Sequence, residues 1–437
     1  MNDGRLNIAM VAPFPPEGST HNCLRGTASY TKNLVTSLCT ETDDLQVRVF
    51  ANFLHPPPLT DIPSEPDSPI TSIKNTFRLH RGCEVLRCWN EDVRFPFQTF
   101  ICIWRHRKEV DIVHIQHEYT QFGRSLSPLL FPLFLGLLRL IKVPIVVTLH
   151  GVVEKNALTD SFRKQHFLKI PLSLLRFGFE FINQCTGFLA DRLIVHEKYF
   201  KKILMTDYHL AENKIVVIPH GIEIRSDMMK KDIARKVLGV DNRRTLLFFG
   251  HLAGYKGFDI LIDAFKLLDR NDYRLFIVGG EPQYLRDNPH YVKHLIHLKQ
   301  TAHQISNQII FTGFVPEEKI SLYFSATDVA IFPYPEIHAS SGPFSLALSY
   351  KCPFLVSKAF AVLYGLSPEL SFEPTTESLF SKVKDFFESE NLRLNAMKWN
   401  EKFTNERGWS EVTKRTREIY REVYSNSFSE SKPKPTL

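Results

Sequence analysis

The chain has 437 residues, 43% of them hydrophobic and 23% charged, so it is long enough for two or three globular domains and too apolar for a disordered protein. Lysine and arginine number 54 against 47 aspartates and glutamates, and the net charge of +7 is modest for this length. This balance argues against a histone-like nucleic-acid binder and allows a basic face toward phosphates or anionic lipid.

The beginning of the chain lacks the features of an export signal, because the apolar run at 8–14 stops at Pro15 and Pro16 without a cleavage pattern. The longest uncharged run, 125–138, contains two prolines and is shorter than the roughly 20 residues that a membrane-spanning helix needs. The seven cysteines form no C-x-x-C pair, which is typical of reduced thiols in a cytosol. We therefore expect a cytoplasmic protein, either soluble or peripheral at the inner face of a membrane.

Short apolar segments alternate with longer amphipathic ones along the first half of the chain. The pattern predicts strands at 6–14, 47–53, 84–87, 111–116, 144–149, 192–195 and 214–218, and helices that include 27–38, 97–108 and 168–183. Most of these strands are apolar at consecutive positions, as strands buried on both faces are. The alternation predicts a doubly wound α/β domain with a parallel sheet, over residues 1–220.

A second series of the same kind follows Pro219, His220 and Gly221. Strands are predicted at 245–249, 274–278, 308–311, 329–332 and 354–356, and helices at 257–268, 291–302, 317–326 and 344–350. The polar stretch 225–244 reads as a linker with a solvated helix. The second domain is therefore predicted to cover residues 221–409.

Three further segments lie outside this alternation. Residues 56–69 contain six prolines and predict a surface loop. Residues 410–424 follow Trp409 as a charged helix. Residues 425–437 are polar, contain two prolines and predict a disordered tail.

Ligands of a parallel sheet bind at the carboxyl ends of its strands. After the first strand the chain enters a helix at Gly26, where no side chain blocks the backbone and the helix N-terminus favours an anion. The dinucleotide fingerprint G-x-G-x-x-G is absent. An ordinary capped helix explains this loop equally well.

The first strand of the second domain leads into GHLAGYKG at 250–257. Lys256 at such a strand-to-helix turn can meet a phosphate with its ammonium group, although a Lys-Gly pair alone is usually a plain helix start. The sequence is not a Walker A loop. Further glycine turns follow at 278–280 (VGG) and 340–343 (SSGP), and three such turns at one sheet edge favour a phosphate-bearing ligand.

Histidines end two strands of the first domain. His150 would face the space between the domains, where an imidazole suits hydrogen bonding or proton exchange with a sugar hydroxyl. His117 and Glu118 follow an earlier strand and predict polar contacts with an acceptor. A metal site that includes His114 is the alternative, but strand alternation sends His114 and His117 to opposite faces. We therefore predict no metal.

Six short motifs follow one another along residues 6–424: GTASYT at 26–31, QHEY at 116–119, VTLH at 147–150, IPHG at 218–221, GHLAGYKG at 250–257 and TGFV at 312–315. Taken together, they resemble the GT-B glycosyltransferases of the large retaining group 1 family, family 4-like. The resemblance implies two Rossmann-like domains that face each other across a cleft, and a final helix, here 410–424, that crosses back to the first domain. It also implies a nucleotide diphosphate sugar bound mainly by the second domain, with no cofactor and no metal.

The resemblance also implies roles for single residues. His150 would contact the donor sugar, and Lys256 would neutralise the diphosphate as it leaves, where positive charge is needed. Donor binding would fall to Gly26, His251, Gly313, Phe314, Ser341, Gly342 and Pro343.

Two positions depart from the family pattern. His251 stands where the family usually has an arginine, and the family's two glutamates, eight positions apart, fall at His338 and Leu346. Glu336 substitutes only if the loop is shifted, and leucine cannot accept hydrogen bonds from ribose hydroxyls.

The leading hypothesis is a hexosyltransferase of polysaccharide or glycoconjugate biosynthesis, whose hydroxyl acceptor is a glycan, a lipid-linked sugar or a small molecule. The missing glutamates motivate the alternative of a non-catalytic or degenerate nucleotide-sugar-binding relative. A GT-B epimerase or phosphorylase is the third possibility. No nucleic-acid partner is expected.

The helix predicted at 168–183 suggests peripheral membrane contact. Arg163, Lys164 and Lys169 gather at its amino end, next to Phe162 and Phe167, as suits a helix lying on anionic lipid. Its apolar face consists of Leu168, Leu172, Leu175, Phe179 and Ile182. The alternative is that this face packs against the sheet, as it does in any covering helix.

Overall fold

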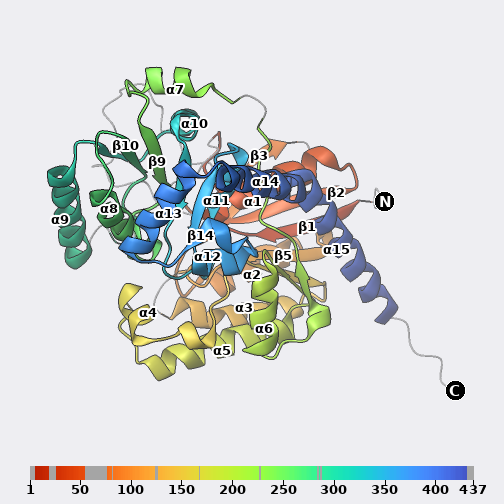
Figure 1. Ribbon diagram of the computed structural model, residues 1–437. Coiled ribbons are helices and arrows are strands. Elements are labelled where there is room, and N and C mark those ends of the chain that lie inside the picture. The colour runs from red at the N-terminus through yellow and green to blue at the C-terminus, as the bar shows by residue number, and fades with distance from the viewer. Residues whose placement is uncertain are drawn as a thin grey trace, which may run out of the picture.

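The computed structural model describes residues 5–18, 26–54, 76–80, 82–123, 126–166, 168–225, 228–282, 285 and 288–430. Two sheets, each flanked by helices, occupy the first and the second half of the chain (Figure 1). The proline-rich loop expected at 56–69 and residues 431–437 of the expected tail lie outside the described residues.

The first sheet has eight strands in the order β3-β4-β2-β1-β5-β6-β7-β8. They span β1 Leu6–Val11, β2 Leu45–Asn52, β3 Thr76–His80, β4 Cys83–Trp89, β5 Ile112–His117, β6 Ile145–Leu149, β7 Arg192–Val195 and β8 Ile215–Val217. Neighbouring strands are parallel, except that β3 runs antiparallel to β4. The predicted parallel sheet is confirmed, whereas β3 was not predicted.

Both faces of this sheet are buried by helices, which explains the consecutive apolar positions of its strands. Ile8 and Met10 of β1 pack with residues of α1 (Gly26–Glu41) and α15 (Trp409–Glu430). Ala9 and Val11 belong to the cluster on the opposite face. That cluster takes in residues of α2 (Phe95–Arg105), α3 (Phe131–Arg139), α5 (Leu172–Leu189) and α6 (Lys198–Thr206).

The second sheet has six parallel strands in the order β11-β10-β9-β12-β13-β14. They span β9 Arg244–Phe249, β10 Tyr273–Val278, β11 Ile309–Gly313, β12 Val329–Phe332, β13 Phe354–Ser357 and β14 Ser371–Phe372. Its helices are α8 Phe258–Lys266, α9 Pro289–Ile305, α10 Glu317–Ala326, α11 Gly342–Ser349, α12 Lys358–Tyr364, α13 Thr376–Glu388 and α14 Glu390–Arg407. The second doubly wound unit is therefore confirmed.

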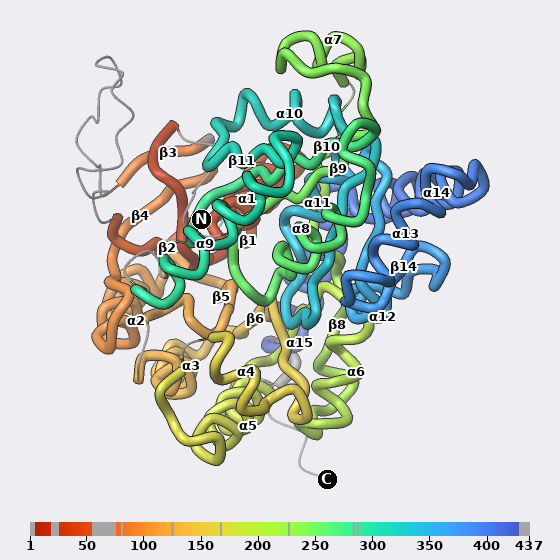
Figure 2. Tube along the Cα trace, turned by 60° about the vertical axis from the view of Figure 1, so that its left-hand side comes forward, coloured from red at the N-terminus to blue at the C-terminus, as the bar shows by residue number. Residues whose placement is uncertain are grey.

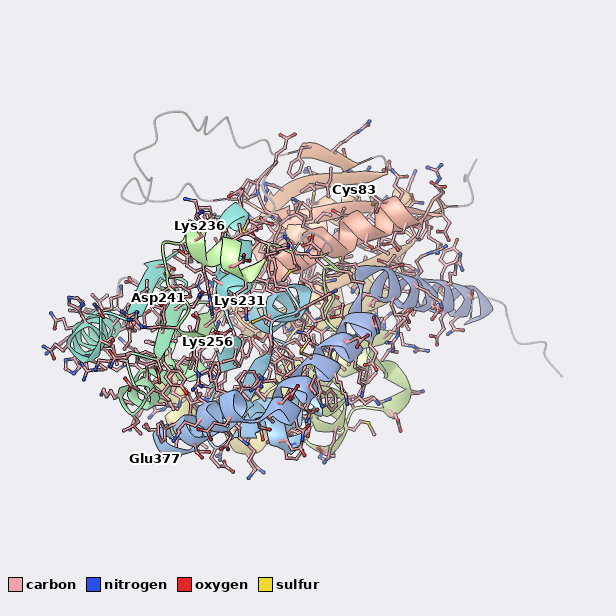
Figure 3. All side chains as sticks on the ribbon, turned by 45° about the horizontal axis from the view of Figure 1, so that its top comes forward. Cys83, Lys231, Lys236, Asp241, Lys256 and Glu377 are labelled. Atoms are coloured by element: carbon pink, nitrogen blue, oxygen red, sulfur yellow. The ribbon has the colours of Figure 1, made fainter. Side chains whose placement is uncertain are left out.

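The polar stretch between the two sheets contains the short helix α7 (Lys231–Val237), as expected. It projects from one end of the molecule (Figure 2) and is held by Lys231, whose Nζ lies 2.6 Å from Asp328 Oδ1. Figure 3 labels Lys231 and Lys236 on this helix.

The last helix crosses back to the first domain, as the resemblance implied. In Figure 1 α15 runs along the first domain, where Thr413 donates a 2.8 Å hydrogen bond to Ser37 of α1. The hydroxyl of Tyr420 lies 2.6 Å from Nδ1 of His114. The helix continues to Glu430, so residues 425–430 are helical and the expected disordered tail is wrong for them.

The helix expected at 168–183 begins at Leu172 and continues to Leu189. Pro171 occupies the N-cap of α5, since proline cannot donate a backbone hydrogen bond within a helix. A separate helix, α4 (Asp160–Gln165), precedes it and is capped by Thr159, whose hydroxyl accepts from the backbone of Phe162.

Candidate active site

Two glycine turns meet at the carboxyl ends of β9 and β10. Gly279 has φ +138°, and a Cβ there would lie 2.0 Å from the carbonyl oxygen of Gly250. The backbone of Leu252 donates to Gly280 at 3.0 Å. Because any side chain at position 279 would clash, the two turns form one backbone surface at the sheet edge.

Lys256 lies beside this surface, in the turn that enters α8. A Cβ added at Gly250 would lie 2.8 Å from Lys256 Nζ and 3.0 Å from Cγ of Pro343, so all three residues converge. Lys256 is labelled in the second domain in Figure 3, and it is buried, with only 5% of its surface exposed. Burial lowers the pKa of Lys256 to about 8.

The turn after Lys256 depends on glycine. Gly257 has φ +65°, and a Cβ there would come within 2.1 Å of the carbonyl oxygen of Pro333. This close approach carries the chain directly from the lysine into α8.

The N-terminus of α11 lies on the other side of Gly250. Ser341 caps the helix, with its hydroxyl accepting from the backbone of Phe344 at 3.3 Å, and a Cβ at Gly342 would meet nothing within 4 Å. Ser340 Oγ is buried and has no hydrogen-bond partner among the described residues. A buried ammonium, an open helix N-terminus and an unused hydroxyl therefore lie close together, which suits an anionic ligand.

An exposed aromatic ring borders the same edge. A Cβ at Gly280 would lie 2.3 Å from the ring of Phe314, and the ring centroids of Phe314 and His251 are 5.8 Å apart. Gly313 accepts a 3.0 Å hydrogen bond from Gly279. Since Phe314 is exposed, its ring can stack on a planar group that reaches this edge.

The carboxyl edge of the first sheet brings together two predicted residues. Gly26 opens α1, and a Cβ there would meet nothing within 4 Å. The next residue, Thr27, donates a 2.9 Å hydrogen bond to Oε2 of Glu118, at the end of β5. Gly26 and Glu118 are therefore neighbours at this edge.

The two sheet edges meet directly at the end of β6. Gly151 forms an isolated antiparallel bridge with Ala339, and Val152 donates to the carbonyl of His338 at 2.8 Å. A Cβ at Gly151 would lie 2.5 Å from that carbonyl oxygen. The carbonyl of His150 accepts from Ser340 at 3.2 Å, so His150 lies in the contact between the domains.

The ring of His150 is held from within the first domain. Its Nδ1 lies 3.2 Å from Nε2 of His196, whose Nδ1 lies 2.9 Å from the carbonyl oxygen of Ile218. Because a carbonyl only accepts, neutral His196 carries its proton on Nδ1 and accepts from His150. His150 Nε2 lies 2.9 Å from the amide of Gln116, which must then present its NH₂ group. Both ring nitrogens are thus occupied, which differs from the expected orientation toward the space between the domains.

Several imidazoles around His150 are buried in the neutral form. The ring of Tyr30 lies at their centre, 4.7 Å from His150, 5.0 Å from His196 and 4.9 Å from His220 between centroids. Burial lowers the pKa of His196 to about 3 and that of His220 to about 4. Burial, and then the neighbouring histidines, hold the pKa of His150 well below its usual value.

His117 does not lie where an acceptor contact was expected. It is buried, its ring centroid is 4.0 Å from that of Phe131, and burial lowers its pKa to about 3. His114 hydrogen-bonds Tyr420 on the opposite face of the sheet. The prediction that His114 and His117 face opposite ways is therefore confirmed, whereas His117 is an aromatic-core residue.

Sequence reasoning missed several residues of this region. His196 ends β7 as His150 ends β6, so the same strand-end signal could have identified it. Gln116 and Tyr30 stood within the quoted motifs without a role. Tyr334 lies beyond the end of β12, with Lys256 Nζ 5.6 Å above its ring centre.

Comparisons with known proteins agree with this geometry. A family model described as Glycosyl transferases group 1 matches residues 230–365, and one described as Glycosyltransferase Family 4 matches residues 24–226. The chain belongs to the group 1 glycosyltransferases. The expected family is confirmed, and the two matches divide the site, with Gly26 and His150 in one and Lys256 and Gly342 in the other.

The matching relatives of this group 1 glycosyltransferase are distant. An alpha-monoglucosyldiacylglycerol synthase of Streptococcus pneumoniae is 26% identical over 253 residues, 55% of this chain and 51% of that protein. The chain thus spans about half the length of this curated relative. Sucrose-phosphate synthase from Thermosynechococcus elongatus superposes with a TM-score of 0.70 at 15% identity, over 97% of this chain and 100% of that one. HepE from Anabaena, in complex with UDP and glucose, superposes with a TM-score of 0.64 at 15% identity. The superposition covers 96% of this chain and 100% of the HepE chain. These likenesses confirm the GT-B fold.

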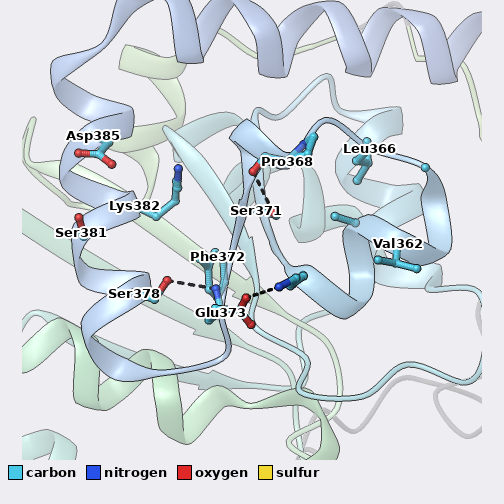
Figure 4. Close-up of a pocket in the computed structure, with 13 residues that line it drawn as sticks. Val362, Leu366, Pro368, Ser371, Phe372, Glu373, Ser378, Ser381, Lys382 and Asp385 are labelled. Atoms are coloured by element: carbon cyan, nitrogen blue, oxygen red, sulfur yellow. Dashed lines mark hydrogen bonds and ion pairs between the residues drawn. The ribbon is translucent and has the colours of Figure 1, made fainter.

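Three further observations bound the site of this group 1 glycosyltransferase. Among the described residues, no group of three or more His, Cys, Asp and Glu side chains is arranged to hold a metal ion. Within the same residues, every helix is too short or too polar to cross a bilayer. A separate surface pocket of about 720 Å³ lies along α12 and α13, where Lys358 pairs with Glu373 (Figure 4), and none of its lining residues belongs to the site.

Proposed function

We propose that this group 1 glycosyltransferase moves a hexosyl group from a nucleotide diphosphate sugar to a hydroxyl acceptor, with retention at the anomeric carbon. The observation that carries the proposal is the buried ammonium of Lys256 beside Gly250 and Pro343, at the open N-terminus of α11. A buried cation at a helix N-terminus is suited to a diphosphate.

Lys256 would supply the charge that the leaving group needs. With a pKa of about 8, the side chain is mostly protonated at neutral pH, and a diphosphate beside it raises that pKa further. As the bond from the anomeric carbon to the phosphate oxygen breaks, negative charge grows on that oxygen. Lys256, the amides of α11 and the hydroxyl of Ser340 would stabilise this charge in the transition state. The acceptor oxygen gains the bond to the anomeric carbon and gives its proton to the phosphate oxygen that leaves.

The nucleotide base would lie against Phe314, with Gly313 and His251 beside it. HepE, which shares the fold, was solved with UDP and glucose, so UDP-glucose is the first donor to test. We propose no metal and no cofactor, because Lys256 and the helix N-terminus can neutralise the diphosphate without them.

The sequence leaves three classes of acceptor open: a glycan, a lipid-linked sugar and a small molecule. The alpha-monoglucosyldiacylglycerol synthase of Streptococcus pneumoniae is named for a glycolipid product. For this chain we propose a lipid-linked acceptor, and with it a cytoplasmic protein in peripheral contact with the inner face of a membrane. His150 and Glu118 would lie nearest to the transferred sugar and the acceptor.

A nucleotide-sugar-binding protein without transfer is the second candidate. The observation that favours it is the absence of the family's two glutamates, whose positions are occupied by His338 and Leu346. Leu346 packs against the apolar core, and Ser345 Oγ lies 3.0 Å from Nδ1 of His220. Glu336, the carboxylate nearest in sequence, is 3.3 Å from His338 in an ion-pair geometry.

Release of nucleoside diphosphate from a panel of nucleotide sugars, with and without glycan and glycolipid acceptors, tests the proposal. We expect release with at least one donor and a loss of about a hundredfold or more in Lys256→Ala, that is, about 2.7 kcal/mol or more of barrier. Lys293→Ala, an exposed lysine on α9, is the control and should keep its activity. Binding of a nucleotide sugar without any release would favour the second candidate, and full activity in Lys256→Ala would refute the role of this lysine.

A further inference from the structure

An extended apolar surface covers the outer side of the first domain. Three helices that pack side by side, α2 against α3 and α3 against α5, expose large apolar side chains to solvent. Figures 1 and 2 both show these helices together at the lower side of the molecule. We call this the α2–α3–α5 face, and its exposed apolar residues are Phe97, Ile101, Trp104, Leu126, Leu133, Leu140, Ile170, Leu174, Phe177, Phe181 and Phe188.

Helix α5 is apolar on two opposite sides. The apolar stripe of the sequence analysis faces inward, since Leu175 and Ile182 are buried and Phe179 packs beside Phe162. Of the two alternatives for this stripe, packing within the domain is therefore confirmed. The outward side carries Phe177 and Phe181, whose rings stack with centroids 6.0 Å apart. It begins at Ile170 and Leu174 and continues to Phe188 with the spacing of one helical face.

The segment through α3 is apolar all round. No charged residue occurs from Leu126 to Leu138, although Leu126 and Leu133 are exposed. A Cβ at Gly136 would meet nothing within 4 Å, so no part of the described chain covers this helix there. A helix that is apolar all round belongs inside a protein or against lipid.

The size of this surface exceeds what a monomer normally leaves in water. Its five aromatic side chains are between 39% and 80% exposed. At about 150–250 Å² per aromatic side chain, they alone expose roughly 500 Å². The largest apolar patch on a typical monomer is about 300–600 Å² in total, and six aliphatic side chains add to the figure here.

Positive charge accompanies the apolar surface. In the segments 93–109, 126–143 and 160–189, which include the three helices, two exposed charged side chains are acidic, Glu109 and Asp160, and each pairs with an arginine. Eight are basic: Arg94, Arg105, Arg107, Lys108, Lys142, Lys164, Lys169 and Arg176. The whole chain has 54 basic and 47 acidic residues, so the excess of basic side chains is specific to these segments.

We infer that the α2–α3–α5 face docks on the surface of an anionic lipid bilayer, with its aromatic side chains in the interface and its basic side chains at the lipid head groups. Interfacial helices combine these two features, and their binding strengthens with the apolar area buried and with the attraction to anionic lipid. The eight cations also disfavour a second copy of this chain as the occupant, because a two-fold contact would set like charges against one another.

The docked orientation would bring the candidate active site near the bilayer, and this step rests on the proposed function with a lipid-linked acceptor. Phe162 of α4, beside the basic start of α5, lies 5.3 Å from His338 between ring centroids. His166 stacks on Tyr255, next to Lys256, at 5.8 Å. The basic end of the face therefore adjoins the loops that hold the proposed donor site.

Vesicle flotation of the full chain tests the inference. We expect binding to phosphatidylglycerol vesicles, little binding to phosphatidylcholine vesicles, and a decrease as salt rises because the basic residues are exposed. Lys256→Ala should bind like the wild type, which separates this test from the test of catalysis.

Variants of exposed residues test the face without disturbing the core. The triple variant Phe177→Ser, Phe181→Ser, Phe188→Ser should bind phosphatidylglycerol vesicles about tenfold or more weakly, since three interfacial rings are removed. Ile296→Ser with Met397→Ser removes equally exposed apolar side chains from α9 and α14 and should bind normally.

A charge-reversal pair separates the electrostatic contribution. Lys164→Glu with Lys169→Glu should also bind anionic vesicles about tenfold or more weakly, whereas Lys293→Glu on α9 should not differ from the wild type. Equal losses in the test and control variants would overturn the inference. So would an absence of vesicle binding, binding that ignores lipid charge, or a dimer in solution that the triple serine variant dissociates.

Discussion

The neutral histidines buried beside the candidate active site predict a steep loss of stability in mild acid. Burial lowers the pKa of His114, His117 and His196 to about 3 and that of His220 to about 4, and it lowers that of His150 strongly. In the unfolded chain each titrates near 6.5. Below pH 6.5 the unfolded state therefore binds more protons than the folded state does. The free energy of unfolding decreases as the pH falls from 6.5 toward 3.

The magnitude follows from linkage. Between pH 6 and pH 5 each of the four histidines whose pKa falls to about 3 or 4 costs about 1.2 kcal/mol of unfolding free energy, which makes about 5 kcal/mol in total. Because folded proteins are stable by only about 5–15 kcal/mol, this step removes a large part of the stability. Carboxylates titrate mostly below this window and add little to the slope.

Urea unfolding followed by tryptophan fluorescence at a series of pH values measures this slope. His117→Phe removes one of the buried histidines in an aromatic environment and should reduce the change in unfolding free energy between pH 6 and pH 5 by about 1.2 kcal/mol. His297→Gln, an exposed histidine on α9, should leave it unchanged. A free energy of unfolding that is flat between pH 6 and pH 5 would refute the assignment of neutral buried histidines.

Three further predictions concern single sites. Arg407→Leu leaves Glu197 buried without the guanidinium that binds it at 2.6 and 3.0 Å, and it should cost about 3–5 kcal/mol of unfolding free energy in urea, which Glu197→Gln partly restores. Gly151→Ala places a Cβ 2.5 Å from the carbonyl of His338 and should lower the melting temperature and weaken UDP binding, whereas Gly136→Ala, with open space around it, should not. His150→Ala should lower turnover per folded molecule at least tenfold, or about 1.4 kcal/mol of barrier; a lower melting temperature with unchanged turnover would make the ring purely structural.

The sequence predicted the sheets well because their strands are buried on both faces. Runs such as 144–149 contain no polar alternation, and each such run was found as a strand. The segment after 357 was missed for a physical reason. Helix α14 is mostly polar and exposes Leu394 and Met397, so its apolar face is weak in the sequence, and β14 is only two residues long.

The parts of the candidate site that depend on backbone turns were predictable from the sequence. Gly250, Gly257 and Gly279 mark turns that need an absent side chain, and glycine is visible in any sequence. The burial and the neighbours of individual side chains were not predictable in the same way. Whether Lys256 is buried, or which side chains surround His117, depends on packing between segments that are distant in the chain.

The crossing of α15 has a consequence for how the protein is made on the ribosome. The first domain is synthesised early, but the face that carries His114 and α1 stays uncovered until α15 emerges, because Tyr420 and Thr413 complete it. Its apolar residues, among them Ile8 and Met10, thus remain accessible to chaperones throughout synthesis of the second domain. A nascent chain that stalls before Trp409 would expose this half-finished layer, and quality control could recognise it there.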